Sequence, residues 1–470
     1  MRKTKIICTI GPASENEAVL TKMCEAGMNV ARLNFSHGTH EEHKKKFDLI
    51  KSVREKLDMP IAIMLDTKGP EYRIKTFENK KITLSDGDVF TFTTEDIIGN
   101  QSRVSVTYKD LTRELSVGDR ILLNNGLVIF EVMELTDTDA ICKTVVGGEL
   151  SDRKSMNFPN KVFHNDYLSE ADKSDILFGI QEGIEFVAAS FVSNKGDVQA
   201  LRSFLDENGG RDIDIIAKIE NRSGVDNIEE ICELSDGIMV ARGDLGVEIP
   251  FVEVPSIQKY LIKKCRLLGK RVITATEMLE SMIHNPRPTR AEISDVANAV
   301  YDGSSAIMLS GETAAGKYPV AAVKNMAEIA KYTEEHINYK SWFATTDYKI
   351  RNKLDAVSHA TCAMSIDLDA KCIVVSSKSG LTARMVSRFR SPVDILGVTT
   401  DVRAWRKLNL SWGVTPVLSE EFSSLDVLMY ESLMKAKNVM KLKKGDNVVL
   451  TGGLINGKSG NTNTIKVETI

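Results

Sequence analysis

The sequence predicts an α/β protein: a (β/α)8 (TIM) barrel interrupted by an all-β lid domain and followed by a separate α/β domain. Short apolar segments alternate with amphipathic helical segments, the alternation stops near residue 72 and resumes at residue 172, and eight apolar segments are counted in all. A doubly wound parallel sheet also fits such alternation. The positions of the polar residues must therefore distinguish the two folds.

The first three apolar segments precede the interruption and read TKIICTI, MNVARLN and PIAIMLD, with predicted helices at 19–26 and 40–57 between them. From Tyr72 to Phe163 the chain becomes rich in Thr, Val and Ile, with the polar turns SDGD, VGDR and NNG, which is typical of a small all-β domain. Five more apolar segments follow: IEFVAAS, IDIIAKI, GIMVA, RVITAT and SAIMLS. We therefore assign residues 1–70 and 172–345 to the barrel and 71–171 to the inserted lid.

Residues 346–470 are predicted to form the third domain, with strands such as CIVVSS and NVVLT. GGLINGKS (452–459) fits the P-loop pattern, but a P-loop must open a helix, and the β-branched NTNTIKVETI that follows predicts a strand. We reject it as a nucleotide site. SSKSGLTAR (376–384) places Ser, Lys and Gly before a predicted helix, which suits either a phosphate-binding loop or an ordinary helix cap.

Net charge, the length of apolar runs and the distribution of cysteines exclude several classes of protein. The net charge of −4 argues against a nucleic-acid partner, which requires a basic surface. No apolar run reaches the roughly 20 residues that span a membrane, and the start, MRKTKIICTIGP, is too weakly apolar for a signal peptide. The seven cysteines are dispersed, which indicates reduced thiols rather than disulfides or zinc sites. We expect a cytoplasmic protein.

Lys218 and Glu220 interrupt the apolar segment IDIIAKIEN (213–221). Successive side chains of a strand point to opposite faces, so these two lie side by side on one face. Taken alone, the pair favours a structural ion pair. Charged groups at the end of a strand are also frequent at functional sites. Other residues of the chain must therefore show whether this pair is structural or functional.

Polar residues follow most of the predicted barrel strands. They are Arg32, Asn34 and Ser36; Asp66 and Thr67; Lys218 and Glu220; Arg242, Gly243 and Asp244; Thr276 and Glu277; and Ser310, Gly311 and Glu312. In a barrel all of these converge on the carboxyl-end face, where active sites are built, and this convergence favours the barrel over the doubly wound sheet.

The chemistry of these residues suits phosphoryl transfer. Glu220 and Asp244 are hard oxygen ligands suited to Mg²⁺, while Lys218, Arg32 and Arg73 supply positive charge for a phosphoryl group in transfer. A second set offers one carboxylate and several neutral oxygens, which suits a monovalent ion, although the residues alone favour helix caps. That set is Asn34, Ser36, Asp66 and Thr67.

The chain resembles the pyruvate kinase family over essentially its whole length. The matching stretches are KTKIICTIGP, GMNVARLNFSHG, LDTKGPEYR, FVAASFV, AKIEN, MVARGDLGVEIP, NPRPTRAE and LSGETAAGKYP. The resemblance implies transfer of phosphate from phosphoenolpyruvate to ADP, which gives pyruvate and ATP. It also implies the same three-part fold, with the third domain regulatory.

The resemblance assigns roles to matching positions. Lys218 stabilises the phosphoryl group and the enolate, Arg32 contacts the substrate phosphate, and Thr276 and Ser310 lie where a proton reaches the enolate through water. Further implied assignments fall into three groups: Gly243, Asp244 and Thr276 hold phosphoenolpyruvate; Arg73, Lys154 and His37 attend the nucleotide; Glu220 and Asp244 bind Mg²⁺ or Mn²⁺.

The resemblance also implies a K⁺ site at Asn34, Ser36, Asp66 and Thr67, which replaces the helix-cap interpretation. Glu71, in DTKGPE, matches the residue found in the potassium-dependent branch of the family. A phosphorylated metabolite and a homotetramer are implied as partners. The expected effector residues are Ser376, Ser377, Lys378, Ser379, Gly380, Lys458, Ser459 and Gly460. The sequence departs from the family pattern at Glu277 (generally glutamine), Asn124 and Asn125 (usually acidic), Tyr72 (aliphatic) and the stretch RKSMNFPN around Lys154.

Two other functions share some of these sequence features. A barrel lyase or aldolase acting on phosphoenolpyruvate or pyruvate would use the same metal carboxylates, but would need neither a nucleotide lid nor a potassium site. A catalytically dead metabolite sensor would have lost Lys218 or a metal ligand, and this chain keeps both.

Overall fold

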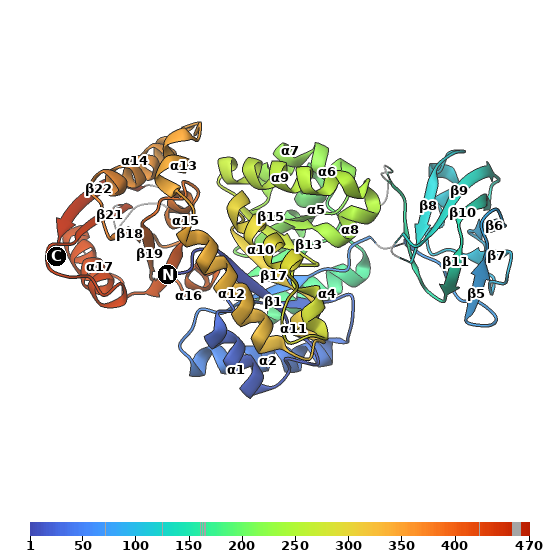
Figure 1. Ribbon diagram of the computed structural model, residues 1–470, viewed down its shortest axis with the longest axis horizontal. Coiled ribbons are helices and arrows are strands. Elements are labelled where there is room, and N and C mark those ends of the chain that lie inside the picture. Colours follow the sequence, from blue (N-terminus) through green and yellow to red (C-terminus); the bar gives the residue numbers. More distant parts are fainter. Residues whose placement is uncertain are drawn as a thin grey trace.

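The computed structural model describes residues 1–70, 72–124, 126–159, 161, 163, 166–422, 424–453 and 462–470. Figure 1 shows three bodies in a row: a central barrel, a β-rich body at one end and the C-terminal part of the chain at the other. The N-terminus lies between the barrel and the C-terminal part. The catalytic chemistry expected from the sequence belongs to the end of the barrel that faces the β-rich body.

Eight parallel strands, all within the described residues, close the barrel in the order β1-β17-β16-β15-β14-β13-β3-β2. They are β1 (Lys5–Thr9), β2 (Val30–Asn34), β3 (Ala62–Asp66), β13 (Phe186–Ala189), β14 (Asp214–Ile219), β15 (Gly237–Ala241), β16 (Arg271–Ala275) and β17 (Ala306–Leu309). Each of the eight apolar segments supplies one strand. The prediction of a barrel is confirmed, and the doubly wound sheet is excluded.

Helices surround the barrel. They are α1 (Glu17–Ala26), α2 (His40–Lys56), α4 (Glu170–Glu182), α5 (Lys195–Glu207), α6 (Arg222–Asp226), α7 (Ile228–Leu234), α8 (Arg242–Glu248), α9 (Val254–Leu268), α10 (Arg290–Asp302), α11 (Gly311–Ala314) and α12 (Pro319–Glu335), with short 3-10 turns η1 (Phe251–Glu253) and η2 (Glu280–Ile283). Capping boxes start several of them. In α2, for example, Thr39 and Glu42 satisfy each other's backbone N–H groups.

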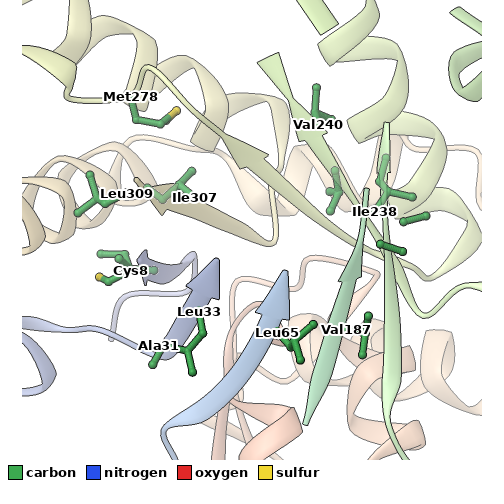
Figure 2. Packing of buried hydrophobic residues seen from close by; sticks show 14 of the residues in the cluster. Cys8, Ala31, Leu33, Leu65, Val187, Ile238, Val240, Met278, Ile307 and Leu309 are labelled. Carbon is green, nitrogen blue, oxygen red and sulfur yellow. The ribbon is translucent and has the colours of Figure 1, made fainter. Parts of the chain in front are cut away.

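Alternate residues of each strand face opposite sides of the barrel wall. Figure 2 shows one side, where Cys8, Leu33, Leu65 and Val187 belong to the core between the strands and the surrounding helices. The residues between them fill the barrel interior. That second cluster is Ile7, Val30, Ala62, Met64, Phe186, Ala188, Ile216, Met239, Ile273, Ala275, Ala306, Met308 and Leu410. Leu410 comes from the C-terminal part, so that part closes the amino end of the barrel.

The β-rich body pairs its strands in the order β4-β12-β8-β9-β10-β6-β7, with β11 and β5 as a separate pair. Its elements are β4 (Tyr72–Arg73), β5 (Lys81–Leu84), β6 (Val89–Thr93), β7 (Arg103–Ser105), α3 (Leu111–Glu114), β8 (Arg120–Leu123), β9 (Val128–Leu135), β10 (Asp139–Val146), β11 (Gly148–Ser151) and β12 (Ser155–Asn157). Phe90, Phe92 and Phe130 pack against one another at its centre in edge-to-face and tilted arrangements. It therefore has a core of its own.

The C-terminal part is a mixed sheet with helices, ordered β20-β19-β18-β21-β22. Its elements are α13 (Tyr339–Thr345), α14 (Lys353–Asp367), β18 (Cys372–Ser376), α15 (Leu381–Ser387), β19 (Asp394–Thr399), α16 (Val402–Leu408), β20 (Val414–Leu418), α17 (Leu425–Val439), β21 (Asn447–Gly453) and β22 (Thr462–Thr469). β22 pairs antiparallel with β21. A strand, not a helix, follows residues 452–461, as the rejection of a P-loop requires.

The division at residues 70/71, 171/172 and 345/346 stays a prediction. The seven cysteines are free and buried. Among the described residues, every helix is too short or too polar to cross a lipid bilayer.

Charged residues join the C-terminal part to the barrel. Asp214, at the start of β14, is buried and accepts hydrogen bonds from Arg271 Nη1 at 2.6 Å and from Lys407 Nζ at 2.8 Å. Burial by itself would raise the pKa of Asp214, but the cations around it, Arg271 first, lower it far below its usual value. The folded state therefore favours the ionised carboxylate.

We predict that Asp214→Asn lowers the free energy of unfolding at neutral pH by about 3–5 kcal/mol, because it leaves buried cations unpaired. Because the pKa of Asp214 is lowered in the folded state, its ionised carboxylate contributes its full stability above the unfolded-state pKa of about 3.9. This stability is lost progressively as the pH falls below that value. Thermal unfolding from pH 7 down to pH 3 should therefore show the gap between variant and wild type closing. Asp369→Asn is the control, since its ion pair is exposed. An equal loss in both variants contradicts the assignment.

Candidate active site

A cleft of about 280 Å³ lies between the carboxyl ends of the barrel strands and the β-rich body. The barrel contributes Arg32, Asn34, Ser36, Lys68, Pro70, Ser190, Phe191, Ser193, Asn194, Asp197, Lys218, Glu220, Asn221, Asp244, Val247 and Glu248. The β-rich body and the segment after it contribute Tyr72, Ser155, Met156, Asn157, Phe158, Lys161, Phe163 and Tyr167. The cleft thus joins residues that are far apart in sequence.

Lys218 lies at the base of this cleft and is buried. Its Nζ lies 3.0 Å from Asp66 Oδ1 and 3.0 Å from Glu220 Oε1, and it donates to Ser190 Oγ at 2.7 Å. Lys218 follows Ile216 on the face that fills the barrel interior, so the strand delivers the ammonium to the axis of the barrel. The predicted pairing of Lys218 with Glu220 is confirmed.

Asp66 links this lysine to Arg32. Arg32 Nε donates to Asp66 Oδ2 at 2.7 Å and Arg32 Nη1 donates to Thr9 Oγ1 at 2.9 Å. β2 and β3 are adjacent, and their register places Asn34 beside Asp66. One fully buried carboxylate therefore fixes two cations at the cleft.

The pKa shifts of the central groups favour the charged forms of Lys218 and Asp66 and disfavour the charged form of Glu220. Burial lowers the pKa of Lys218, but Asp66 and Glu220 outweigh it and raise that pKa above its usual value. Burial would raise the pKa of Asp66, yet Arg32 and Lys218 lower it. Burial and the nearby Asp244 raise the pKa of Glu220, although Lys218 opposes the rise. Glu220 is thus the group most in need of an added positive charge.

Glu220 is anchored on one side only. Its Oε2 accepts the N–H of Phe191 at 2.6 Å, whereas its Oε1, although close to Lys218, is buried and has no hydrogen-bond partner among the described residues. Asp244 lines the same cleft and is exposed. It follows β15, the neighbour of β14 in the barrel. Both predicted metal ligands therefore face one cleft, and Glu220 Oε1 has the Lys218 ammonium as an ion-pair partner but no hydrogen bond.

Ser190 is a functional candidate that the sequence analysis does not name. It follows β13 directly, accepts a hydrogen bond from Lys218, and donates to the Thr67 carbonyl at 2.7 Å. Lys218 and Thr67 are thereby connected through one hydroxyl. The sequence could have identified Ser190, because it is the polar residue that follows the fourth barrel strand. The other candidate site residues were found at this same position on their own strands.

Thr276 and Gly243 are brought together as predicted. The Gly243 N–H donates to Thr276 Oγ1 at 2.8 Å. Thr276 (φ 70°) and Glu277 (φ 53°) both adopt left-handed backbone, which is costly for a β-branched residue. Arg242 stabilises this turn by donating to the Thr276 carbonyl at 2.6 Å and the Glu277 carbonyl at 3.1 Å.

Ser310 lies apart from these contacts. It precedes α11, and its N–H donates to Glu312 Oε2 at 2.7 Å. Neither Ser310 nor Thr276 lines the cleft itself.

The helix-cap interpretation of Asn34 and Ser36 is wrong. The N-cap of α2 is Thr39. Asn34 Oδ1 instead accepts the N–H of Ser36 at 3.2 Å, and both side chains line the cleft. Neither side chain therefore caps α2, and the Asn34 side chain is held beside the cleft by its contact with Ser36.

The predicted nucleotide residues lie outside the cleft lining. Arg73, in β4, donates through Nη1 to the Arg153 carbonyl at 2.5 Å. Lys154 is half-buried and His37 is exposed. The β-rich body instead contacts the barrel through Asn157, whose Nδ2 donates to Glu248 Oε1 at 2.8 Å. Glu71 and Asn125 lie outside the described residues.

The first predicted effector loop follows β18 and leads into α15. Lys378 forms an exposed ion pair with Glu421 at 2.9 Å. The second loop, with Lys458, Ser459 and Gly460, lies outside the described residues. Ser376 pairs with Gly452 on the adjacent parallel strand β21, so β18 and β21 end on the same side of the sheet.

Comparisons with known proteins agree with this geometry. The family model "Pyruvate kinase, barrel domain" matches residues 1–323, and "Pyruvate kinase, alpha/beta domain" matches residues 355–468. The chain is 48% identical to a pyruvate kinase of Clostridium acetobutylicum, with both chains covered completely. It is 47% identical to one of Geobacillus stearothermophilus, covering 100% of this chain and 80% of the relative.

A solved structure also matches. The crystal structure of a pyruvate kinase from Cryptosporidium parvum superposes with a TM-score of 0.95 at 38% identity, covering 100% of this chain and 96% of that one. The chain therefore belongs to the pyruvate kinase family, phosphotransferases that move the phosphoryl group of phosphoenolpyruvate to ADP in glycolysis.

Proposed function

We propose that Lys218 is the residue that stabilises the phosphoryl group as it passes from phosphoenolpyruvate to ADP, and the enolate left behind. The supporting observation is its position: a buried ammonium at the base of the cleft, fixed by Asp66, Glu220 and Ser190. A preorganised cation in a site of low dielectric stabilises developing negative charge without having to reorganise. Its raised pKa keeps it protonated at neutral pH.

Arg32 is proposed to bind the substrate phosphate from the other side of Asp66. It lines the cleft, and its contacts with Asp66 and Thr9 set the direction of its guanidinium. Lys218 and Arg32 then hold the phosphate between two cations, which favours a near-attack geometry. Gly243, Asp244 and Thr276 complete the phosphoenolpyruvate site in this proposal.

The family in general depends on a divalent ion and on potassium. We propose that Glu220 and Asp244 hold Mg²⁺ or Mn²⁺. Two observations support the fit: Glu220 Oε1 is a buried carboxylate oxygen without a hydrogen bond, and Mg²⁺ ordinarily takes only one or two protein carboxylates. When bound, the ion would neutralise charge on the phosphoryl oxygens.

The potassium site is proposed at Asn34, Ser36, Asp66 and Thr67. The donor set suits a monovalent ion, because it combines neutral oxygens with a single carboxylate. Asp66 already contacts Arg32 and Lys218, and the Thr67 carbonyl already accepts from Ser190. An ion here would therefore share these oxygens with the groups that bind substrate, which would couple its presence to the position of both cations.

The remaining roles are carried over from the family resemblance at matching positions of the sequence. Thr276 and Ser310 are proposed to relay, through water, the proton that reaches the enolate. Arg73, Lys154 and His37 are proposed to contact the nucleotide, which requires the β-rich body to move relative to the arrangement described above. The Asn157–Glu248 hydrogen bond is one contact between the two bodies that such a movement would alter.

We further propose that the chain forms a homotetramer. Large apolar side chains are exposed on η1, α9 and α10, and such patches mark protein interfaces. They are Phe251, Val252, Tyr260, Ile293 and Tyr301.

We predict that Lys218→Met lowers kcat by at least about 100-fold, because electrostatic stabilisation of this kind supplies about 3 kcal/mol or more. The control is Lys5→Met, which removes another buried lysine of the barrel wall at the opposite, amino end. Steady-state kinetics coupled to lactate dehydrogenase and thermal unfolding would be measured for both. A folded Lys218 variant with near-normal turnover would remove Lys218 from the mechanism.

The dependence of activity on potassium tests whether Asn34 binds an ion or only supports the local fold. We predict that replacing K⁺ by a large organic cation depresses activity, and that Asn34→Ala raises the K⁺ concentration needed for half-maximal activity by about tenfold or more. Thr39→Ala removes the true cap of α2 and should cost about 1 kcal/mol of stability while leaving the K⁺ titration unchanged. Full activity of the wild type without K⁺ or Na⁺ would exclude the site.

The effector proposal places a phosphorylated metabolite between residues 376–380 and 457–461. If the effector favours one quaternary state, it should make sigmoidal saturation with phosphoenolpyruvate more hyperbolic. Joint replacement of Lys378 and Lys458 by Ala should abolish this shift and leave saturated turnover almost unchanged. Saturation curves with a panel of phosphorylated metabolites would test it, and a variant that still responds shows that these loops are only connections.

A further inference from the structure

The peptide group between Ser190 and Phe191 lies at the active-site cleft and is held from both sides. Its carbonyl oxygen accepts a hydrogen bond from the hydroxyl of Tyr167 at 2.8 Å, and its N–H donates to Glu220 Oε2 at 2.6 Å. All four residues line the cleft. Because a peptide group is planar and rigid, the phenol and the carboxylate are linked through a single unit of backbone.

The backbone that follows this peptide is strained. Phe191 has a left-handed conformation (φ 55°), which is unfavourable for a residue with a Cβ atom. Such a conformation persists only where the surrounding structure enforces it. The two hydrogen bonds supply part of that enforcement, because rotation of the peptide would break both of them. Glu220 would then lose the N–H group that anchors its Oε2.

Tyr167 belongs to the segment that returns from the β-rich body to the barrel, two residues before Ser169, the N-cap of α4. Its side chain packs against the core between the barrel strands and the surrounding helices. Burial, together with Asp197 and other carboxylates nearby, raises the pKa of Tyr167 well above its usual value. The hydroxyl therefore keeps its proton and acts as a hydrogen-bond donor.

The segment that leaves the barrel for the β-rich body packs against the same peptide. A Cβ atom at Gly69 would lie 2.7 Å from Ser190 Cβ and 3.2 Å from the Ser190 carbonyl oxygen, and Gly69 has a φ of 72°. A glycine is required for so close an approach. The Gly69 N–H also donates to Asp172 Oδ1 at 3.1 Å, in the first turn of α4. Both connections to the β-rich body therefore meet at Ser190.

The two hydrogen bonds of the peptide form one chain, from the Tyr167 hydroxyl to the Glu220 carboxylate. Hydrogen bonds in such a chain polarise one another in a protein interior. Donation to the carbonyl therefore makes the Phe191 N–H a better donor to Glu220 Oε2. With Oε2 fixed in this way, Oε1 lies 3.0 Å from Lys218 Nζ. The phenol thus acts on the direction of the whole carboxylate without touching it.

We propose that Tyr167 is a positioning residue for the metal site: its hydroxyl fixes the Ser190–Phe191 peptide, and the peptide fixes the Glu220 carboxylate. The inference rests on the proposed role of Glu220 as a ligand of Mg²⁺ or Mn²⁺. Groups that orient a metal ligand from outside the coordination shell typically change metal affinity by about 10–100-fold when they are removed.

We predict that Tyr167→Phe, which removes only the hydroxyl, weakens Mn²⁺ binding to the substrate-free full chain by about tenfold or more. Binding is measured from the electron paramagnetic resonance signal of free Mn²⁺ at a constant K⁺ concentration. The matched control is Tyr348→Phe, because the Tyr348 hydroxyl also donates to a backbone carbonyl, that of Phe389, at 3.0 Å, but in the C-terminal part. This control should leave the Mn²⁺ affinity unchanged.

Hydrogen exchange in the metal-free protein reports on the peptide itself. Tyr167→Phe should speed exchange of the Phe191 amide by about threefold or more, because the peptide loses one of the two hydrogen bonds that hold it. Tyr348→Phe should leave the exchange of this amide as in the wild type. Unchanged exchange at Phe191 in the Tyr167 variant would overturn the proposal.

Glu220→Gln separates the two assignments. If this variant binds Mn²⁺ as tightly as the wild type, Glu220 is not a ligand, and the proposed metal site falls together with the inference. If Glu220→Gln loses Mn²⁺ while Tyr167→Phe keeps wild-type affinity, the metal site stands and the role of Tyr167 is overturned. Equal weakening in Tyr167→Phe and Tyr348→Phe would also overturn that role, since the loss would then reflect stability in general.

Discussion

The carboxylate of Asp66 is the group on which the arrangement of the active site depends. It is fully buried and contacts Arg32 through one oxygen and Lys218 through the other. Two cations this close would repel each other in a buried environment, and the shared carboxylate makes their proximity tolerable. Asp66 is thus proposed as a positioning residue for both cations, in addition to its proposed part in the potassium site.

The two ends of the barrel differ. The carboxyl end carries the charged residues of the active site, and the amino end is closed by the C-terminal part. At the carboxyl end, the interior face of β14 carries Lys218, whereas the apolar interior below it includes Ile216 and ends against Leu410 of the C-terminal part. The charges at the amino end, such as Asp214 and Arg271, neutralise one another in direct contacts. The cleft therefore opens at the carboxyl end of the barrel, on the side of the β-rich body, where Glu220 Oε1 lacks a hydrogen bond among the described residues.

Much of this could be predicted from the sequence, because parallel strands in a barrel bring their carboxyl ends together whatever their distance along the chain. Counting strands located Lys218, Glu220 and Asp244 correctly at one cleft. The N-cap of α2 was readable, because Thr39 and Glu42 have the spacing of a capping box. Contacts that depend on side-chain direction were not predictable, as with the Ser190 hydroxyl that donates to the Thr67 carbonyl. Nor did any local pattern mark Glu248 as the barrel contact of Asn157, since that hydrogen bond joins residues 91 positions apart.

Glu277 stands where the family pattern generally has glutamine, and the structure shows why the turn that carries it tolerates the change. The backbone of Thr276 and Glu277 is strained, and Arg242 holds both residues through their carbonyl oxygens while Asp295 fixes Arg242 by two contacts of 2.8 Å. The Glu277 side chain is exposed and takes no part in these contacts. The turn that presents the Thr276 hydroxyl to Gly243 is therefore stabilised by backbone groups that any residue supplies. A carboxylate in place of the amide expected from the resemblance leaves this turn intact and changes only the charge displayed beside it.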